Sequence, residues 1–208
     1  MIFFVEKILN SPIESNSFLI YTNENKSCVI VDPGTENCKS LFEFIKKKQL
    51  EPEYIFLTHE HFDHIWGVNK LKNTYNDVKI IASRECSLNI VNKKKNLSVF
   101  YNQVGFDCYP ADILIEDIGL KLFWNDSYFK FFKTKGHSEG SICFSISNYL
   151  FTGDTLIKDE KTVTKLPGGS KDELALSNIL LLNEFQTINP LVCSGHNDSF
   201  FFCESKLL

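Results

Sequence analysis

Short apolar runs alternate with amphipathic stretches along the first part of the chain. Runs rich in Ile, Val, Phe and Tyr, with turn residues between them, predict three strands of a meander at 2–8, 17–22 and 27–32. Apolar residues spaced to fall on one helical face predict a helix over 37–48. The run at 54–57 predicts a short buried strand that leads directly into a histidine-rich segment.

The remainder of the chain continues this mixture of helix and strand patterns. The predicted helices are 65–75, 84–91 and 173–185, and the predicted strands are 78–82, about four within 113–133 and 141–152, and a last one at 191–193. Residues 92–111 have a weak, polar pattern with interspersed aromatics, which we interpret as an irregular insert near the functional site. Together these patterns predict an α/β fold and a single domain over residues 1–208.

Composition narrows the classes of function that the chain can have. With 208 residues, 43% of them hydrophobic, the chain can bury enough surface to fold without a structural metal or a disulfide. A net charge of −4 and a pI near 5.8 give no electrostatic case for nucleic acid or an anionic membrane as the partner, so we expect a small-molecule substrate. No stretch has the length of a membrane span, and the N-terminus lacks the pattern of a signal peptide.

Cysteine usage favours a cytoplasmic protein. The chain has 7 cysteines, an odd number, and none of them forms a Cys-x-x-Cys motif. This pattern is typical of reduced thiols rather than of a secreted disulfide framework. The basic run Lys93-Lys94-Lys95 is local, and we interpret it as a solvated loop. The sequence leaves the oligomeric state open.

Residues 58–67 read Thr-His-Glu-His-Phe-Asp-His-Ile-Trp-Gly and carry the strongest chemical signal. His59, His61, Asp63 and His64 lie close together in a chain that has only 5 histidines. Imidazole and carboxylate groups bind zinc, iron or manganese at neutral pH. The alternative is a solvated polar loop that holds histidines by chance, and the clustering favours a metal site. Since the chain needs no metal to fold, we expect the metal to serve function.

Further ligand-capable residues follow predicted strands in the same way. His137 and His196 each come directly after a glycine, Asp154 comes after Thr152-Gly153, and Asp32 ends the strand at 27–32. A glycine at a strand end lets the backbone turn sharply. If these strands share one edge of a sheet, their ends converge with the histidine-rich segment, and every histidine of the chain lies in one site.

Four of these residues have alternative interpretations. Asp32, in an Asp-Pro-Gly turn, is interpreted as a turn-forming residue or as a support for a ligand rather than as a ligand. Asp154 could simply cap a turn, and His196 has the weakest local context. Glu60 alternates with two candidate ligands, so we expect it to point outward or to lie behind a ligand. The neighbouring histidines favour metal binding by Asp154 and His196.

The combined motifs strongly resemble one family. They are Thr-His-Glu-His-Phe-Asp-His at 58–64, Gly-His-Ser-Glu-Gly-Ser at 136–141, Phe-Thr-Gly-Asp-Thr-Leu at 151–156, Leu-Pro-Gly-Gly at 166–169 and Ser-Gly-His at 194–196. This set resembles the metallo-β-lactamase-fold hydrolase superfamily, and within it the small bacterial enzymes similar to glyoxalase II (hydroxyacylglutathione hydrolase). The resemblance covers nearly the whole chain. The motifs specify the fold and metal binding, and they do not specify the substrate.

The resemblance implies an αββα sandwich, with two mixed β-sheets flanked by helices and a two-metal site at one edge. It implies two zinc ions, although relatives also take iron or manganese. By the same resemblance the first metal is held by His59, His61 and His137, the second by Asp63, His64 and His196, and Asp154 bridges the two.

Such a site predicts a metal-dependent hydrolase. Two metal ions about 3.5–4 Å apart can share one water and lower its pKa, so that a metal-bound hydroxide cleaves a small ester or thioester. Asp63 and Asp154 are the candidate catalytic residues, and Asp154 sets the metal spacing. Asp32 or Glu60 could orient a ligand imidazole from behind. None of the cysteines has a recognisable activating partner in the sequence, so we predict no thiol nucleophile.

The chain departs from the glyoxalase II pattern in three ways. Thr162-Val163-Thr164-Lys165 stands where Gly-Arg-x-Asp is frequent, and Ser138-Glu139 stands where Thr-Pro is common. The chain also ends soon after His196, so we expect no helical domain that helps to bind glutathione. The acyl group and the role of glutathione therefore stay open.

Two other functions fit parts of the same pattern. Relatives that resemble persulfide dioxygenase are oxidoreductases that use one iron, held by residues that match His59, His137 and Asp154. A non-catalytic metal-binding protein is the other alternative. The intact set of seven ligand-capable residues favours the hydrolase, because a binding protein needs neither both aspartates nor all five histidines.

Overall fold

Two six-stranded sheets form the centre of the computed structural model, which describes residues 2–116, 119–205 and 207. The first sheet has the order β1 (Phe3–Leu9), β2 (Asn16–Thr22), β3 (Ser27–Val31), β4 (Glu51–Phe56), β5 (Lys79–Ser83), β6 (Ile113–Ile115). The second has the order β12 (Phe200–Phe201), β11 (Leu191–Ser194), β10 (Tyr149–Gly153), β9 (Ile142–Ile146), β8 (Ser127–Lys133), β7 (Lys121–Trp124).

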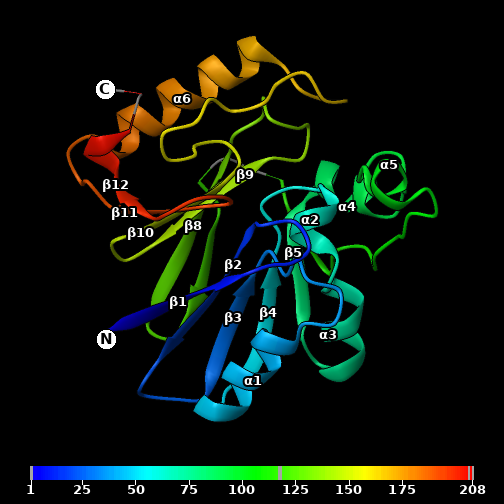
Figure 1. The fold of residues 1–208 in the computed structure, drawn as a ribbon. Helices are drawn as coiled ribbons and strands as arrows, with labels where there is room; N and C mark the ends of the chain where they lie inside the picture. Colours follow the sequence, from blue (N-terminus) through cyan, green and yellow to red (C-terminus); the bar gives the residue numbers. More distant parts are fainter. Residues whose placement is uncertain (1, 117–118, 206, 208) are drawn as a thin grey trace.

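Helices cover the outer faces of both sheets, which gives the predicted αββα sandwich (Figure 1). The helices are α1 (Lys39–Lys48), α2 (Phe62–Ile65), α3 (Val68–Thr74), α4 (Arg84–Ile90), α5 (Ser98–Asn102) and α6 (Lys171–Phe185), with a short 3-10 turn at Phe202–Glu204. Apolar residues of α1, α3 and α4 pack in one core cluster with the first sheet. Leu181 and Phe185 of α6 pack against the second sheet.

Alternating side chains explain how each sheet serves two cores. Ile55 of β4 belongs to the core beneath the helices, whereas its neighbour Phe56 belongs to the core between the sheets. There the Phe56 ring lies 4.7 Å from Phe129 and 5.1 Å from Phe144, centroid to centroid. Strands buried on both faces read as continuous apolar runs, because neither face meets water. The chain therefore has the short apolar runs expected of buried strands.

Both sheets are mixed, and the parallel pairs decide where the site lies. β1, β2 and β3 form the predicted antiparallel meander. β3, β4, β5 and β6 then run parallel to one another, and β10 runs parallel to β11 in the second sheet. Parallel neighbours end at the same edge, so the loops after β3, β4, β10 and β11 are delivered to one side of the sandwich.

The structure corrects several predicted elements. The helix predicted over 65–75 is shorter, because α3 covers Val68–Thr74 and Trp66-Gly67 separates it from α2, which ends at Ile65. A Cβ at Gly67 would lie 2.2 Å from Cys38 Sγ, so the glycine allows these two segments to approach closely. The stretches 113–133 and 141–152 hold five strands rather than four, and β12 was not predicted. The insert 92–111 is not wholly irregular, because it contains α5.

Residues 117 and 118 fall inside the predicted stretch 113–133 and lie outside the described residues. Within the described part of the chain, every helix is too short or too polar to traverse a lipid bilayer.

Candidate metal centre

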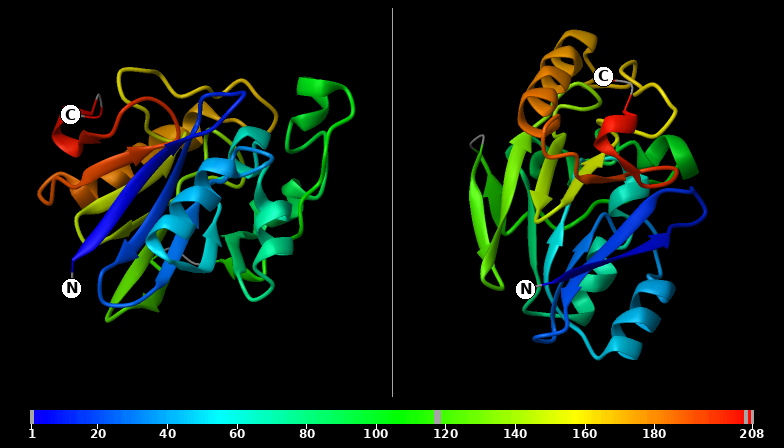
Figure 2. Two further views of the ribbon diagram at one scale, coloured as in Figure 1. Left: turned by 60° about the horizontal axis from the view of Figure 1, so that its bottom comes forward. Right: turned by 90° about the vertical axis from the view of Figure 1, so that its left-hand side faces the viewer.

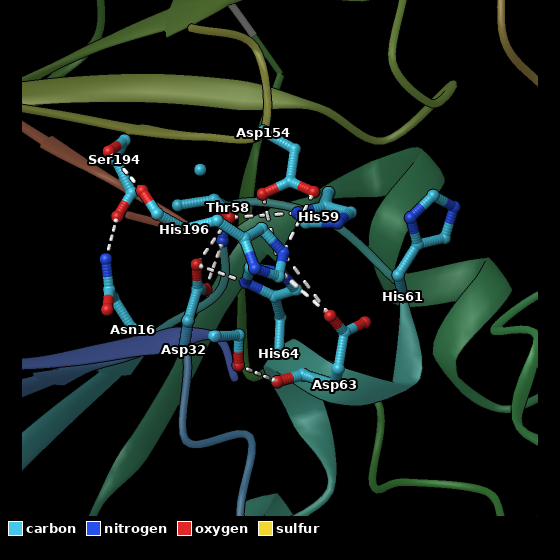
Figure 3. Close-up of polar contacts among 12 residues, drawn as sticks. Asn16, Asp32, Thr58, His59, His61, Asp63, His64, Asp154, Ser194 and His196 are labelled. Atoms are coloured by element: carbon cyan, nitrogen blue, oxygen red, sulfur yellow. Dashed lines mark hydrogen bonds and ion pairs between the residues drawn. The ribbon is translucent and has the colours of Figure 1, made fainter. Parts of the chain in front are cut away.

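The candidate ligands lie where strands of the two sheets end at one edge of the sandwich. β3 leads to Asp32, and its parallel neighbour β4 leads to His59. β10 leads to Asp154, and its parallel neighbour β11 leads to His196. His137 lies in the loop between β8 and β9. In Figure 3 the carboxylate of Asp154, from the second sheet, faces the imidazoles that the first sheet supplies.

Three histidines form the first group that could hold a metal. The ligand atoms of His59, His61 and His137 lie within 4.8 Å of one another, and all three residues are buried. His137 Nε2 and His61 Nδ1 are 2.9 Å apart. Nitrogen atoms of two rings that face each other at this distance can both bind one cation placed beside them.

A second group adjoins the first. The ligand atoms of Asp63, His64 and His196 also lie within 4.8 Å of one another. Asp63 Oδ2 is 3.5 Å from His64 Nε2 and 3.5 Å from His196 Nε2. This group is more open than the first, since the His196 side chain is 23% exposed and that of Asp63 is 13% exposed. Solvent reaches the centre from this side.

Asp154 contacts members of both groups. Its Oδ1 lies 3.4 Å from His64 Nε2, and its Oδ2 lies 3.4 Å from His196 Nε2. The same Oδ2 lies 3.5 Å from His137 Nε2, which belongs to the first group. One carboxylate with an oxygen near each group could bind two cations at once.

Four of the five histidines are held by Nδ1, which turns Nε2 toward the centre. The backbone carbonyls of Val163 and Glu14 accept hydrogen bonds from Nδ1 of His137 (2.9 Å) and of His196 (2.7 Å). The carboxylate of Asp32 accepts from Nδ1 of His64 at 3.1 Å. A carbonyl or carboxylate oxygen can only accept, so each of these Nδ1 atoms carries a proton, and Nε2 is the nitrogen that can offer its lone pair to a cation when the ring is neutral.

His59 is held through a relay. Thr58 Oγ1 donates to Asp32 Oδ2 at 2.6 Å and therefore accepts from His59 Nδ1 at 3.0 Å. Asp32 also accepts from the Thr58 backbone N–H at 2.8 Å. The Asp32 carboxylate thus orients one histidine of each group from the side opposite the centre. Asp32, His59 and His64 also form a compact trio, but the Asp32 oxygens already accept three hydrogen bonds, two from Thr58 and one from His64.

Three inward-facing atoms fit a metal because they make no hydrogen bond. His59 Nε2, His64 Nε2 and Asp154 Oδ1 are buried, and none of them accepts or donates a hydrogen bond among the described residues. Leaving a buried polar atom unpaired costs about 1–3 kcal/mol. Several such atoms in one place, all of them nitrogen or carboxylate oxygen, are what a site for divalent cations requires.

Burial and nearby charges shift the pKa values of the histidines in opposite directions. Burial, reinforced by the field of His137, lowers the pKa of His61 to about 3, and burial with nearby histidines holds the pKa of His59 well below its usual range. Burial opposes charge on His64 and His196 as well, but Asp63 and Asp154 outweigh it. They raise the pKa of His64 to about 9 and that of His196 to about 11.

The carboxylates show the reciprocal effect. Burial favours the protonated form of Asp63 and Asp154, yet His64 and His196 lower the pKa of both, that of Asp154 strongly. The metal-free centre therefore holds ionised carboxylates neutralised by protonated imidazoles, on the side nearer solvent. A divalent cation would replace those protons as the partner of the carboxylates.

Metal uptake is expected to release protons. His64 and His196 are protonated below about 9 and about 11, and only neutral imidazole binds a metal, so loading at pH 7 should displace about two protons. Affinity should therefore rise by about 100-fold per pH unit up to about 9, while both groups exchange protons, and by about tenfold per unit from there to about 11. Calorimetric zinc titration of the metal-free protein, in two buffers of different ionisation enthalpy, measures the protons released. Binding without proton release would contradict the arrangement.

Glu60 does not point outward. It is 2% exposed, and its two carboxylate oxygens accept from Asn89 Nδ2 at 2.9 Å and from Ser138 Oγ at 2.8 Å. Neither contact is to an imidazole. The described structure therefore shows no contact through which Glu60 would orient a ligand ring, as was expected of it. Glu60 instead links the histidine-rich segment to α4 and to the residue that follows His137.

The sequence patterns missed the groups that orient the histidines. Thr58 stood in the motif without an assigned role, and the carbonyls of Glu14 and Val163 gave no signal, because any residue type supplies a carbonyl. Ser15 Oγ, which donates to the Asp63 carbonyl at 2.6 Å, was missed as well. The role of Thr58 could have been suspected from the sequence, because Thr58 is a polar residue directly after the apolar run of a predicted strand.

Residues 11–196 match the metallo-beta-lactamase superfamily, and the chain belongs to that family. Two relatives show the range of its members. The chain is 30% identical over 190 residues to a probable metallo-hydrolase, YqgX, of Bacillus subtilis (strain 168), covering 89% of this chain and 86% of that protein. It is 31% identical over 183 residues to a hydroxyacylglutathione hydrolase of Wigglesworthia glossinidia brevipalpis, covering 88% of this chain but only 62% of that enzyme.

Two solved structures share the fold over nearly their whole length. The structure of BLEG-1, a B3 metallo-beta-lactamase, superposes with a TM-score of 0.87 at 28% identity, covering 97% of this chain and 95% of that one. TTHA1623, solved in a di-iron-bound form, superposes with a TM-score of 0.80 at 25% identity, covering 96% of each chain. The protein thus has a metallo-β-lactamase fold with a histidine and aspartate cluster of the metal-binding kind.

Proposed function

We propose that this protein is a two-metal hydrolase that cleaves a small thioester or ester. The observation that carries the proposal is the position of Asp154, whose oxygens lie 3.4 to 3.5 Å from histidines of both ligand groups. We assign the first metal to His59, His61 and His137 and the second to Asp63, His64 and His196, with Asp154 shared. The di-iron form of TTHA1623 and the name of the hydroxyacylglutathione hydrolase relative support two metals and a thioester.

The residues divide the chemistry between them. Bound divalent ions would supply Lewis acidity and water of lowered pKa. Asp32 and Thr58 hold the ring orientation of His59 and His64, and Asp154 fixes the two ligand groups to each other. Asp63, on the more exposed side, faces the position that a substrate reaches first. In hydrolysis the acyl–sulfur or acyl–oxygen bond breaks, a water oxygen bonds to the acyl carbon, and a water proton goes to the leaving thiolate or alkoxide.

The six buried cysteines do not supply a competing nucleophile. Burial raises the pKa of Cys28, Cys38, Cys108, Cys143 and Cys193 to about 12, and it raises the pKa of Cys86 well above its usual value. A thiol with such a pKa is protonated at neutral pH and is a poor nucleophile. All seven cysteines are free, and we propose a cytoplasmic location on this ground. We further propose a single domain over 1–208 that acts on a small molecule and binds neither nucleic acid nor membrane.

Metal content and a substrate screen test the proposal together. Protein purified without added metal should contain about two zinc, iron or manganese ions per chain. It should hydrolyse short thioesters or esters, and the metal-free protein should not. A β-lactam belongs in the screen because of the BLEG-1 likeness, and a persulfide with oxygen-uptake detection tests the dioxygenase alternative. About one iron per chain with oxygen uptake, or bound metal without any hydrolysis, would contradict the proposal.

A further inference from the structure

The insert 92–111 is built as a defined structure. Asn96 Nδ2 donates to the carbonyl of Phe106 at 2.8 Å and to that of Ile90 at 3.1 Å, which ties both ends of the insert together. Asn102 Oδ1 accepts from the backbone N–H of Gly105 at 2.7 Å and closes the turn after α5. The backbone of the insert around α5 is therefore tied to the end of α4.

Aromatic rings connect this insert to the metal centre. The Tyr101 ring of α5 stacks on Phe62, with centroids 4.9 Å apart and planes at 26°. Trp66 meets Tyr101 edge-on at 5.4 Å and stacks on Phe106 at 5.4 Å. We call these four residues, Phe62, Trp66, Tyr101 and Phe106, the aromatic wall. Phe62 stands in the chain directly between His61 and Asp63, so the wall begins at the metal ligands.

The wall continues into exposed apolar surface. Tyr101 is 41% exposed, and Phe100 and Val104 beside it are 71% and 74% exposed. Figures 1 and 2 show α5 beside α2, the helix that carries Asp63 and His64, and projecting outward from the sandwich. Apolar side chains that are exposed to water next to a reaction centre can gain free energy by covering an apolar part of a bound molecule.

We propose that the aromatic wall binds the apolar acyl group of the substrate. The enzyme then prefers thioesters with an alkyl or aryl acyl chain to those with a small or hydroxylated one. This inference rests on the proposed thioester hydrolysis and names its substrate class. The acyl carbon lies at the metal centre while the chain extends along Phe62 toward Tyr101, because Phe62 adjoins two ligands and its ring lies against Tyr101.

The test compares Tyr101→Ala with wild type on octanoyl and acetyl thioesters of the same thiol, N-acetylcysteamine. Loss of one ring from the wall should lower kcat/KM for the octanoyl thioester by about tenfold and leave the acetyl thioester unchanged. Tyr101→Phe keeps the ring and should retain the wild-type ratio. Phe123→Ala is the matched control, since Phe123 is 76% exposed but lies on β7, in the other sheet. An equal fall for both thioesters in Tyr101→Ala would overturn the inference.

A binding measurement separates this inference from the proposed function. Octanoate added to the metal-loaded protein should change the fluorescence of Trp66, which lies in the wall, and Trp66→Phe should lose that change. Suppose that neither thioester is cleaved, but that octanoate binds and Tyr101→Ala weakens this binding. The aromatic wall is then supported as an apolar binding surface, and the hydrolase proposal fails. If octanoate binds wild type and Tyr101→Ala equally, the wall is overturned. It is also overturned if Tyr101→Ala changes only the oligomeric state, because the apolar face is then a contact between copies.

Discussion

Asp154→Asn is expected to abolish most hydrolysis and to reduce the bound metal at both positions. Asparagine has the same size but carries no charge, and only one of its two terminal atoms can bind a cation. The carboxylate of Asp154 lies 3.4 to 3.5 Å from His64, His196 and His137, so its loss affects both ligand groups. We expect kcat/KM to fall by about 10³-fold. Elemental analysis and thioester kinetics on the same preparation measure both effects.

Two further variants make this result specific. His196→Ala removes a ligand from the second group alone, so it should keep about one metal ion per chain, whereas Asp154→Asn should keep less. Asp198→Asn is the control, because Asp198 is close to His196 in the chain but its side chain is 82% exposed and pairs with Lys7 at the surface. It should behave as wild type. Full metal content in Asp154→Asn would refute a shared ligand, even if activity were lost.

Gly195→Ala is expected to disable the centre while leaving the fold in place. A Cβ at this position would lie 2.2 Å from Asp154 Oδ1 and 2.7 Å from His64 Cε1. The methyl group must therefore displace the shared carboxylate or a second-group histidine. Misplacing such a group costs about 10–100-fold in metal affinity or activity, and we expect the upper end of that range. Kinetics, metal content and thermal unfolding of the variant measure the effect.

Gly119→Ala provides the contrast for this substitution. Gly119 has φ +79, and no atom of the described residues beyond its chain neighbours would lie within 4 Å of a Cβ there. Alanine there should cost about 1 kcal/mol of stability through backbone strain but leave activity intact. Gly195 was expected to serve as a flexible turn before a ligand, like Gly136 (φ +135) and Gly153 (φ +48). In the structure Gly195 has a different role, because the lack of a Cβ leaves room for the Asp154 carboxylate and the His64 ring. Wild-type activity in Gly195→Ala would show that the ligands can shift without loss.

The order of elements could be predicted from the sequence because it depends on local patterning. Apolar runs such as 27–32 and 54–57 marked strands, and the ligand-capable residues stood at their ends. Elements that depend on tertiary contacts were missed. β12 is a strand because Phe200 and Phe201 pair with β11, and Gly67 leaves room for the Cys38 sulfur that a Cβ would meet. The five-residue helix α5 is too short to produce a periodic signal.

The amino-acid sequence by itself determined which chemical groups are present and on which loops they stand. Imidazole and carboxylate side chains at the ends of apolar runs are local features, so the candidate ligands could be named from His59 to His196. Only the tertiary structure decided which nitrogen of each ring faces the centre. That choice depends on partners far away in the chain, such as the Glu14 carbonyl that accepts from His196, 182 positions later. It also decided that Glu60 turns inward and that Tyr101 lies against Phe62, because both contacts require the folded chain to bring separate segments together.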